Sequence, residues 1–108
     1  MYYLARFGKI KIASFLLNSF TVNLNDRDYC SQSPIFYAAR DNQLEIVDLF
    51  ISKGADINLK DENDETCLFY AASQGHLEMC KLLISHGVDV LYVDFKKRSA
   101  LNFAKKGN

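Results

Sequence analysis

Residues Thr66 to Gly87 read TCLFYAASQGHLEMCKLLISHG and predict one helix, a tight turn and a second helix. Thr66 is expected to cap the first helix with its hydroxyl, and the small Ala71 and Ala72 allow close helix packing. Gly75 is predicted to end the first helix and Gly87 the second. Between the two glycines, an apolar stripe is formed by Leu77, Met79, Cys80, Leu82, Leu83 and Ile84. The stretch therefore predicts a helical hairpin with its own start and stop signals.

The same pattern occurs one repeat earlier and, in part, one repeat later. The segment that begins at Ser33, 33 positions before Thr66, reads SPIFYAARDNQLEIVDLFISKG and shares the FYAA run, the Leu-Glu pair and the final glycine. Its helices are predicted near residues 34–41 and 43–52, with Ser33 as N-cap and Pro34 at the first helical position. One repeat later, the start of the pattern is matched by Ser99, Leu101 and Ala104. A helical pair repeated in this way predicts an array in which each unit buries its apolar face against its neighbours.

The spacing and the residues together resemble the ankyrin repeat. The family pattern TPLHxAAxxGHLEIVKLLLxxGADVN corresponds here to SPIFYAA, QLEIVDLFISKGADIN, TCLFYAASQGHLEMCKLLISHGVDV and SALNFAK. The resemblance implies an all-α fold, an ankyrin-repeat αα solenoid with hairpin loops. It implies one array over residues 1–108, with approximate units 1–26 (partial), 27–60, 61–93 and 94–108 (partial). The family histidine is replaced by Phe36, Phe69 and Asn102, so its usual hydrogen bond with threonine is expected to be lost.

Residues 1 to 25 contain three basic side chains, no acidic one and a helical apolar pattern. This composition is typical of a mitochondrial targeting segment. The repeat phase explains individual positions as well, since Ala5 aligns with Ala72 and Leu16 with Leu83. We therefore favour a truncated first repeat over a targeting segment.

Two irregularities of the array are predicted. The connection from Asn23 to Ser33 is two residues longer than that from Asn58 to Thr66, which predicts an insertion around residues 27–32. The first unit lacks most of its first helix and the last unit lacks its second. We therefore expect the chain to be part of a longer polypeptide, or its ends to be covered by another copy or another domain. Uncapped apolar ends also favour self-association.

Charge and cysteine content restrict the partners and the compartment. Thirteen basic and thirteen acidic residues cancel, so no overall field favours nucleic acid or an anionic membrane. A basic last unit leaves nucleic acid and an acidic protein as weaker alternatives; its cations are Lys96, Lys97, Arg98, Lys105 and Lys106. Three cysteines, an odd number, indicate reduced thiols and an intracellular protein, cytoplasmic or nuclear. No apolar run approaches the roughly 18 residues of a membrane span.

The sequence offers little for catalysis or metal binding. Cys67, His76 and Cys80 could supply zinc ligands, but His76 matches the Gly-His-Leu turn of the family and a fourth ligand is missing. Packing is the favoured interpretation, and we expect no metal or other cofactor. The acidic cluster Asp61, Glu62, Asp64 and Glu65 lacks the ligand order of a calcium loop and is expected to be a solvated hairpin tip. We expect no enzymatic activity.

The resemblance implies that protein ligands bind on a concave side formed by hairpin tips and outward positions of the first helices. The positions carried over are Arg6, Phe7, Arg27, Tyr29, Cys30, Gln32, Arg40, Asp41, Lys60, Glu62, Asn63, Glu65, Ser73, Gln74, Phe95, Lys96, Arg98, Lys105 and Lys106. The predicted docking residues among them are Tyr29, Arg40, Asp41, Glu62, Asn63, Ser73, Gln74, Phe95 and Lys96. Tyr29 and Phe95 are the expected anchors, with the alternative that each lies down on its own hairpin.

The favoured function is thus a non-enzymatic module that binds a protein or peptide. A rigid spacer, or an intramolecular brace beside another domain, is the structural alternative. A metal or redox function at the cysteines is the alternative from another class.

Overall fold

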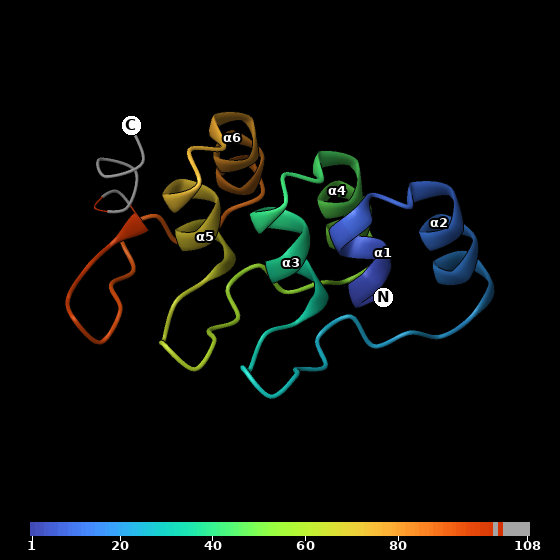
Figure 1. Ribbon diagram of the computed structural model, residues 1–108, viewed down its shortest axis with the longest axis horizontal. Coiled ribbons are helices and arrows are strands. Elements are labelled where there is room, and N and C mark those ends of the chain that lie inside the picture. Colours follow the sequence, from blue (N-terminus) through green and yellow to red (C-terminus); the bar gives the residue numbers. More distant parts are fainter. Residues whose placement is uncertain (101, 103–108) are drawn as a thin grey trace.

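The computed structural model describes residues 1–100 and 102, and the helices of this part of the chain form three pairs (Figure 1). Their bounds are α1 (Tyr2–Phe7), α2 (Ile10–Ser19), α3 (Pro34–Arg40), α4 (Leu44–Ser52), α5 (Cys67–Ser73) and α6 (Leu77–Ser85). Within the described residues, extended pairing is limited to an isolated bridge between Val93 and Ser99. The predicted all-α solenoid is confirmed.

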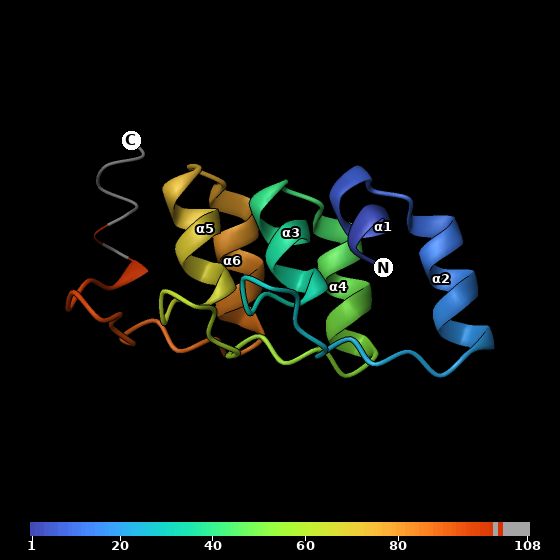
Figure 2. The same cartoon turned by 60° about the horizontal axis from the view of Figure 1, so that its bottom comes forward.

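The helices are stacked in two layers. The first helices form one layer, with α3 packed between α1 and α5, and the second helices form the other, with α4 between α2 and α6 (Figure 2). Ile46 and Val47 occupy adjacent positions of α4 and are both buried. A middle helix therefore needs apolar residues on two flanks, and this explains the broad stripe in the sequence.

A residue with a positive φ separates the two helices of each pair. Gly8 has a φ of 65°, Asn42 of 59° and Gly75 of 72°. Glycine enters this left-handed region without steric cost, and asparagine is one of the few other residues that tolerate it. The chain can therefore reverse direction within two or three residues and lay each second helix against its first.

The predicted side-chain caps of α3 and α5 are wrong. Ser33 and Thr66 hold the N-cap positions, but neither side chain makes a capping hydrogen bond, and both hydroxyls are buried without a hydrogen-bond partner. Phe36 and Phe69 follow three residues later and offer no polar atom. The predicted loss of the threonine–histidine hydrogen bond is confirmed at these two positions.

In the last unit, the residue equivalent to Phe36 and Phe69 is the polar Asn102, and it bonds to the N-cap serine. The side-chain oxygen of Asn102 accepts hydrogen bonds from the backbone N–H of Ser99 at 2.8 Å and from its hydroxyl at 3.3 Å. A side chain that reaches back to the N-cap residue in this way resembles a capping box.

The predicted two-residue insertion around residues 27–32 is also wrong. The side-chain oxygen of Asn25 accepts the backbone N–H of Asp56 at 2.8 Å, and that of Asn58 accepts the N–H of Asp89 at 3.0 Å. Asn25, and not Asn23, is therefore the structural equivalent of Asn58. Counted from Asn25, the connection to Ser33 has the same length as its counterpart in the next unit.

Candidate functional site

Three hairpins project to the same side of the stack (Figure 1). An aspartate side chain shapes each of them. Oδ1 of this aspartate accepts the backbone N–H groups two and four residues further on at 2.9–3.0 Å. The residue three positions on has a φ near 60° in every hairpin. The aspartates are Asp28, Asp61 and Asp94. Such Asx turns fix the shape of the tips before any partner binds.

The second carboxylate oxygen joins the hairpin to the following helix. The Tyr37 hydroxyl donates a hydrogen bond to Asp28, and the Tyr70 hydroxyl donates one to Asp61. Burial, together with the hydrogen bond to the carboxylate, raises the pKa of both tyrosines well above the ordinary value. Both hydroxyls therefore remain donors throughout the physiological pH range.

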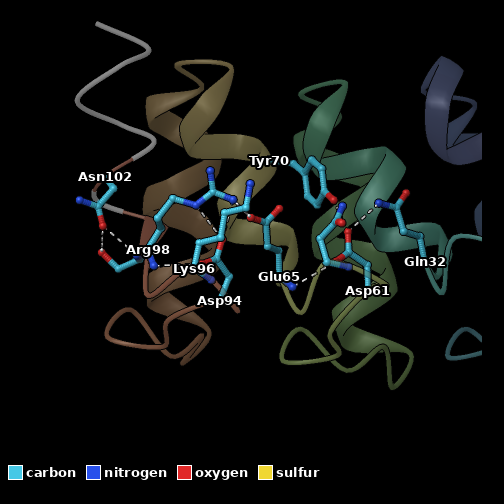
Figure 3. A network of polar contacts seen from close by, with 10 residues as sticks. Gln32, Asp61, Glu65, Tyr70, Asp94, Lys96, Arg98 and Asn102 are labelled. Carbon is cyan, nitrogen blue, oxygen red and sulfur yellow. Dashed lines mark hydrogen bonds and ion pairs between the residues drawn. The ribbon is translucent and has the colours of Figure 1, made fainter.

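Neighbouring hairpins are tied together by the residue four positions after each aspartate (Figure 3). The Gln32 side-chain amide donates to Asp61 Oδ2 at 3.0 Å. Glu65 holds the same position one repeat later, and its carboxyl group lies beside that of Asp94, with both contacted by the same Arg98 nitrogen. Arg98 holds it in the third hairpin, and its guanidinium contacts Asp94 Oδ2 at 2.9 Å and Glu65 Oε2 at 3.4 Å.

These ties correct two predictions. Gln32 and Glu65 were among the positions carried over as partner-facing, yet both are buried between hairpins. The acidic cluster was expected to be solvated, but Asp61 and Glu65 are buried while Glu62 is exposed. Their buried polar atoms have hydrogen-bond or ion-pair partners in the same hairpin, in the following helix and in the neighbouring hairpin, so burial leaves them satisfied.

The electrostatics of Glu65 and Asp94 differ strongly. Burial raises the pKa of Glu65 to about 7, and the hydrogen bond and negative charge of Asp94 act in the same direction. Burial opposes ionisation of Asp94, but hydrogen bonds from Glu65 and Arg98 hold its pKa well below the usual range. Glu65 is therefore the member of the pair that carries the proton.

Five of the predicted docking residues lie on the hairpins. Tyr29 is 93% exposed and Phe95 is 73% exposed, so neither lies down on its own hairpin. Glu62, Asn63 and Lys96 are also exposed. A hollow of about 250 Å³ between the last two hairpins is lined by Asn63, Glu65, Asp94, Phe95, Lys96 and Arg98.

The other four lie at the opposite end of the first helices. Arg40 ends α3 and Asp41 follows it, while Ser73 ends α5 and Gln74 follows it. The Arg40 guanidinium stacks over the Tyr37 ring at 4.7 Å, and Asp41 pairs with Arg6 at 3.6 Å. The Ser73 hydroxyl donates to a backbone oxygen of its own helix.

Two partly buried tyrosines that the sequence pattern did not single out, Tyr37 and Tyr70, join the hairpins to the first helices. Tyr37 contacts the hairpin through Asp28 and the helix end through Arg40. A signal was present in the sequence, because a tyrosine follows the hairpin aspartate at the same spacing in both units. Lys105 and Lys106 lie outside the described residues.

Cys67, His76 and Cys80 have separate environments. The Cys67 thiol donates to the Ile57 carbonyl at 3.6 Å, and His76 Nε2 lies 2.9 Å from the Arg40 carbonyl. Burial raises the pKa of Cys67 to about 12, so it is a protonated thiol at neutral pH. In the described part of the chain, no group of three or more His, Cys, Asp or Glu side chains is placed to hold a metal ion.

The stacked helical pairs and the projecting hairpins define a repeat solenoid that presents a rigid row of tips. Residues 1–61 and 35–108 match the model of a family described as ankyrin repeats in three copies. The chain belongs to the ankyrin-repeat family. Members of this family are generally protein–protein interaction modules.

No curated protein matches the chain. Among the described residues, no helix is both long and apolar enough to cross a membrane.

Proposed function

We propose that this chain is a non-enzymatic module that binds a protein or peptide along the hairpin tips and the adjoining face of the first helices. The observation that carries the proposal is the exposure of Tyr29 and Phe95 on tips whose backbones are held by aspartate turns. Aromatic side chains on a preorganised backbone lose little entropy on binding and dominate interface energies. An intracellular location, cytoplasmic or nuclear, is part of the proposal and is supported by three free cysteines.

Binding is tested by comparing two matched variants in quantitative pull-downs. The tip variant combines Tyr29→Ala, Glu62→Ala and Phe95→Ala, and is expected to lose about tenfold or more of the recovered partner. The control combines Leu77→Ala and Lys81→Ala, two exposed positions on α6. The control should recover the partner as the wild type does. Equal recovery by both variants would instead favour the spacer or intramolecular brace.

We also propose that the array, with units 1–26, 27–60, 61–93 and 94–108, belongs to a longer intracellular protein. Ile12 lies four residues after the positive-φ turn residue of its unit, and Ile46 and Met79 hold the same position in the next two units. Ile12 is 54% exposed, whereas Ile46 is 1% exposed and Met79 is fully buried. The two inner units, each of which follows another helical pair, bury this position, whereas the first unit exposes it. The exposed face of α2 therefore has the character of a repeat interface.

Aromatic contacts between neighbouring units support the same proposal. Tyr37 packs edge-on against Tyr2 of the preceding unit at 5.3 Å, and Tyr70 packs against Phe36 at 6.0 Å. Tyr3 holds the position of Tyr37 and Tyr70 in the first unit, and it is 64% exposed. A preceding helical unit, or another copy of the chain, would cover it.

Sedimentation and thermal unfolding test this second proposal. The chain alone is expected to associate as its concentration rises, and Ile12→Lys should reduce that association because it charges the exposed face. A version extended by its native flanking sequence should melt several degrees higher and remain monomeric. Equal melting temperatures, together with a monomeric short chain at high concentration, would show that the ends need no cover.

A further inference from the structure

The two contacts between neighbouring hairpins lie at equivalent positions but use different side chains. Gln32 presents a neutral amide to the carboxylate of Asp61, and the contact needs no proton. At the equivalent place, the buried Glu65 carboxyl group lies beside the buried Asp94 carboxylate, and one Arg98 nitrogen contacts both. Two carboxyl groups share a hydrogen bond only when one of them is protonated. The second tie therefore depends on pH in a way that the first does not.

The surroundings of this pair do not neutralise both charges. Both side chains are buried, with 8% of Glu65 and 1% of Asp94 exposed. Arg98 is the cation bonded to them, and it lies closer to Asp94, with Nε at 3.0 Å and Nη2 at 2.9 Å from Oδ2, than to Glu65 at 3.4 Å. Lys96 lines the same hollow, but its side chain is exposed to solvent. On the other side, the facing groups are the Asp61 carboxylate, which disfavours ionisation of Glu65, and the Tyr70 hydroxyl.

We infer that protonation of the Glu65–Asp94 pair regulates how firmly the last hairpin is held against the array. With the proton present, Glu65 bridges to Asp94 and the hairpin is docked. When both groups are ionised, their repulsion in a buried setting loosens it. This hairpin carries Phe95 and Lys96, so partner affinity should fall at alkaline pH. Only that last consequence depends on the proposed function.

The sign of the effect follows from proton binding. An unfolded glutamate loses its proton near pH 4.5, and Glu65 in the folded chain loses it near pH 7. Between these values the folded state holds more protons, so the stability of the tie decreases as pH rises. Asp94 has the opposite sign, but its contribution is lost only under more acidic conditions. A comparison between pH 5.5 and pH 8 therefore separates the contribution of Glu65 from that of Asp94.

Hydrogen exchange of the hairpin amides tests the inference without a partner. The backbone N–H groups of Lys96 and Arg98 donate to Asp94 and report on the last hairpin. Those of Asn63 and Glu65 donate to Asp61 and serve as the internal reference. After correction for intrinsic rates, protection of the reporters relative to the reference should fall about tenfold from pH 5.5 to pH 8.

Matched substitutions make the result decisive. Glu65→Gln reproduces the chemistry of Gln32 and should abolish this pH dependence, whereas Glu62→Gln, at an exposed carboxylate of the same hairpin, should leave it intact. Gln32→Glu should place a similar pH dependence on the Asp61 hairpin. A Glu65 carboxyl that titrates near pH 4.5 by NMR, or the same profile in the wild type and Glu65→Gln, would overturn the inference. Neither outcome bears on partner binding.

Discussion

Replacing Phe50 with alanine is expected to lower the free energy of unfolding by about 3–5 kcal/mol. Phe50 lies in α4, the middle helix of its layer, and its side chain is fully buried. The substitution removes apolar contacts and leaves a cavity inside a stack whose stability depends on interfaces between neighbouring units. Urea unfolding followed by circular dichroism measures the loss.

Leu49→Ala is the matched control, because Leu49 precedes Phe50 in the same helix. The sequence stripe predicts that Leu49 and Leu82 fill the interfaces between units, but both are only half-buried, whereas the residues that follow them, Phe50 and Leu83, are fully buried. Leu49→Ala should therefore cost about 1–2 kcal/mol, and Leu77→Ala, at an exposed position of α6, less than about 0.5 kcal/mol. A loss at Leu49 as large as that at Phe50 would mean that the assigned core face of α4 is wrong.

The fold could be predicted because its determinants are local and repeated. The apolar stripe, the glycine that follows α4 and α6 and the 33-residue offset each constrain the same helical pair. The predicted helix 34–41 is observed as α3, and 43–52 as α4, with differences of one residue at one end of each. Agreement among several local signals leaves few alternative folds.

The contacts between hairpins could not be predicted in this way. Gln32 and Asp61 are 29 residues apart, and the polarity of each side chain taken alone indicates exposure. Their burial results from hydrogen bonds that exist only when two hairpins lie side by side. The predicted N-caps were wrong in a different way: the hydroxyls of Ser33 and Thr66 are buried without a hydrogen-bond partner, and the phenylalanine three residues after each offers no polar atom.

Asp61→Ala is expected to lower the free energy of unfolding by about 3 kcal/mol. Its carboxylate accepts four hydrogen bonds, from the backbone N–H groups of Asn63 and Glu65, the Gln32 amide and the Tyr70 hydroxyl. Alanine keeps none of them and leaves the amide of buried Gln32 unpaired beside a small void. Chemical denaturation at pH 7 measures the loss, and NMR of the hairpin amides locates it.

Asp28→Ala separates the energetic contribution of the aspartate turn from that of the hydrogen bond between hairpins. Asp28 makes the same two backbone contacts and accepts the Tyr37 hydroxyl, but it accepts no side-chain amide from a preceding hairpin in the described residues. The loss at Asp28 should therefore be smaller than that at Asp61 by about 1 kcal/mol, the ordinary net value of one hydrogen bond. Gln32→Ala in the Asp61→Ala background should then cost little, because the two residues share one interaction. Additive losses in this double-mutant cycle would show that the Gln32–Asp61 contact does not couple the second hairpin to the first.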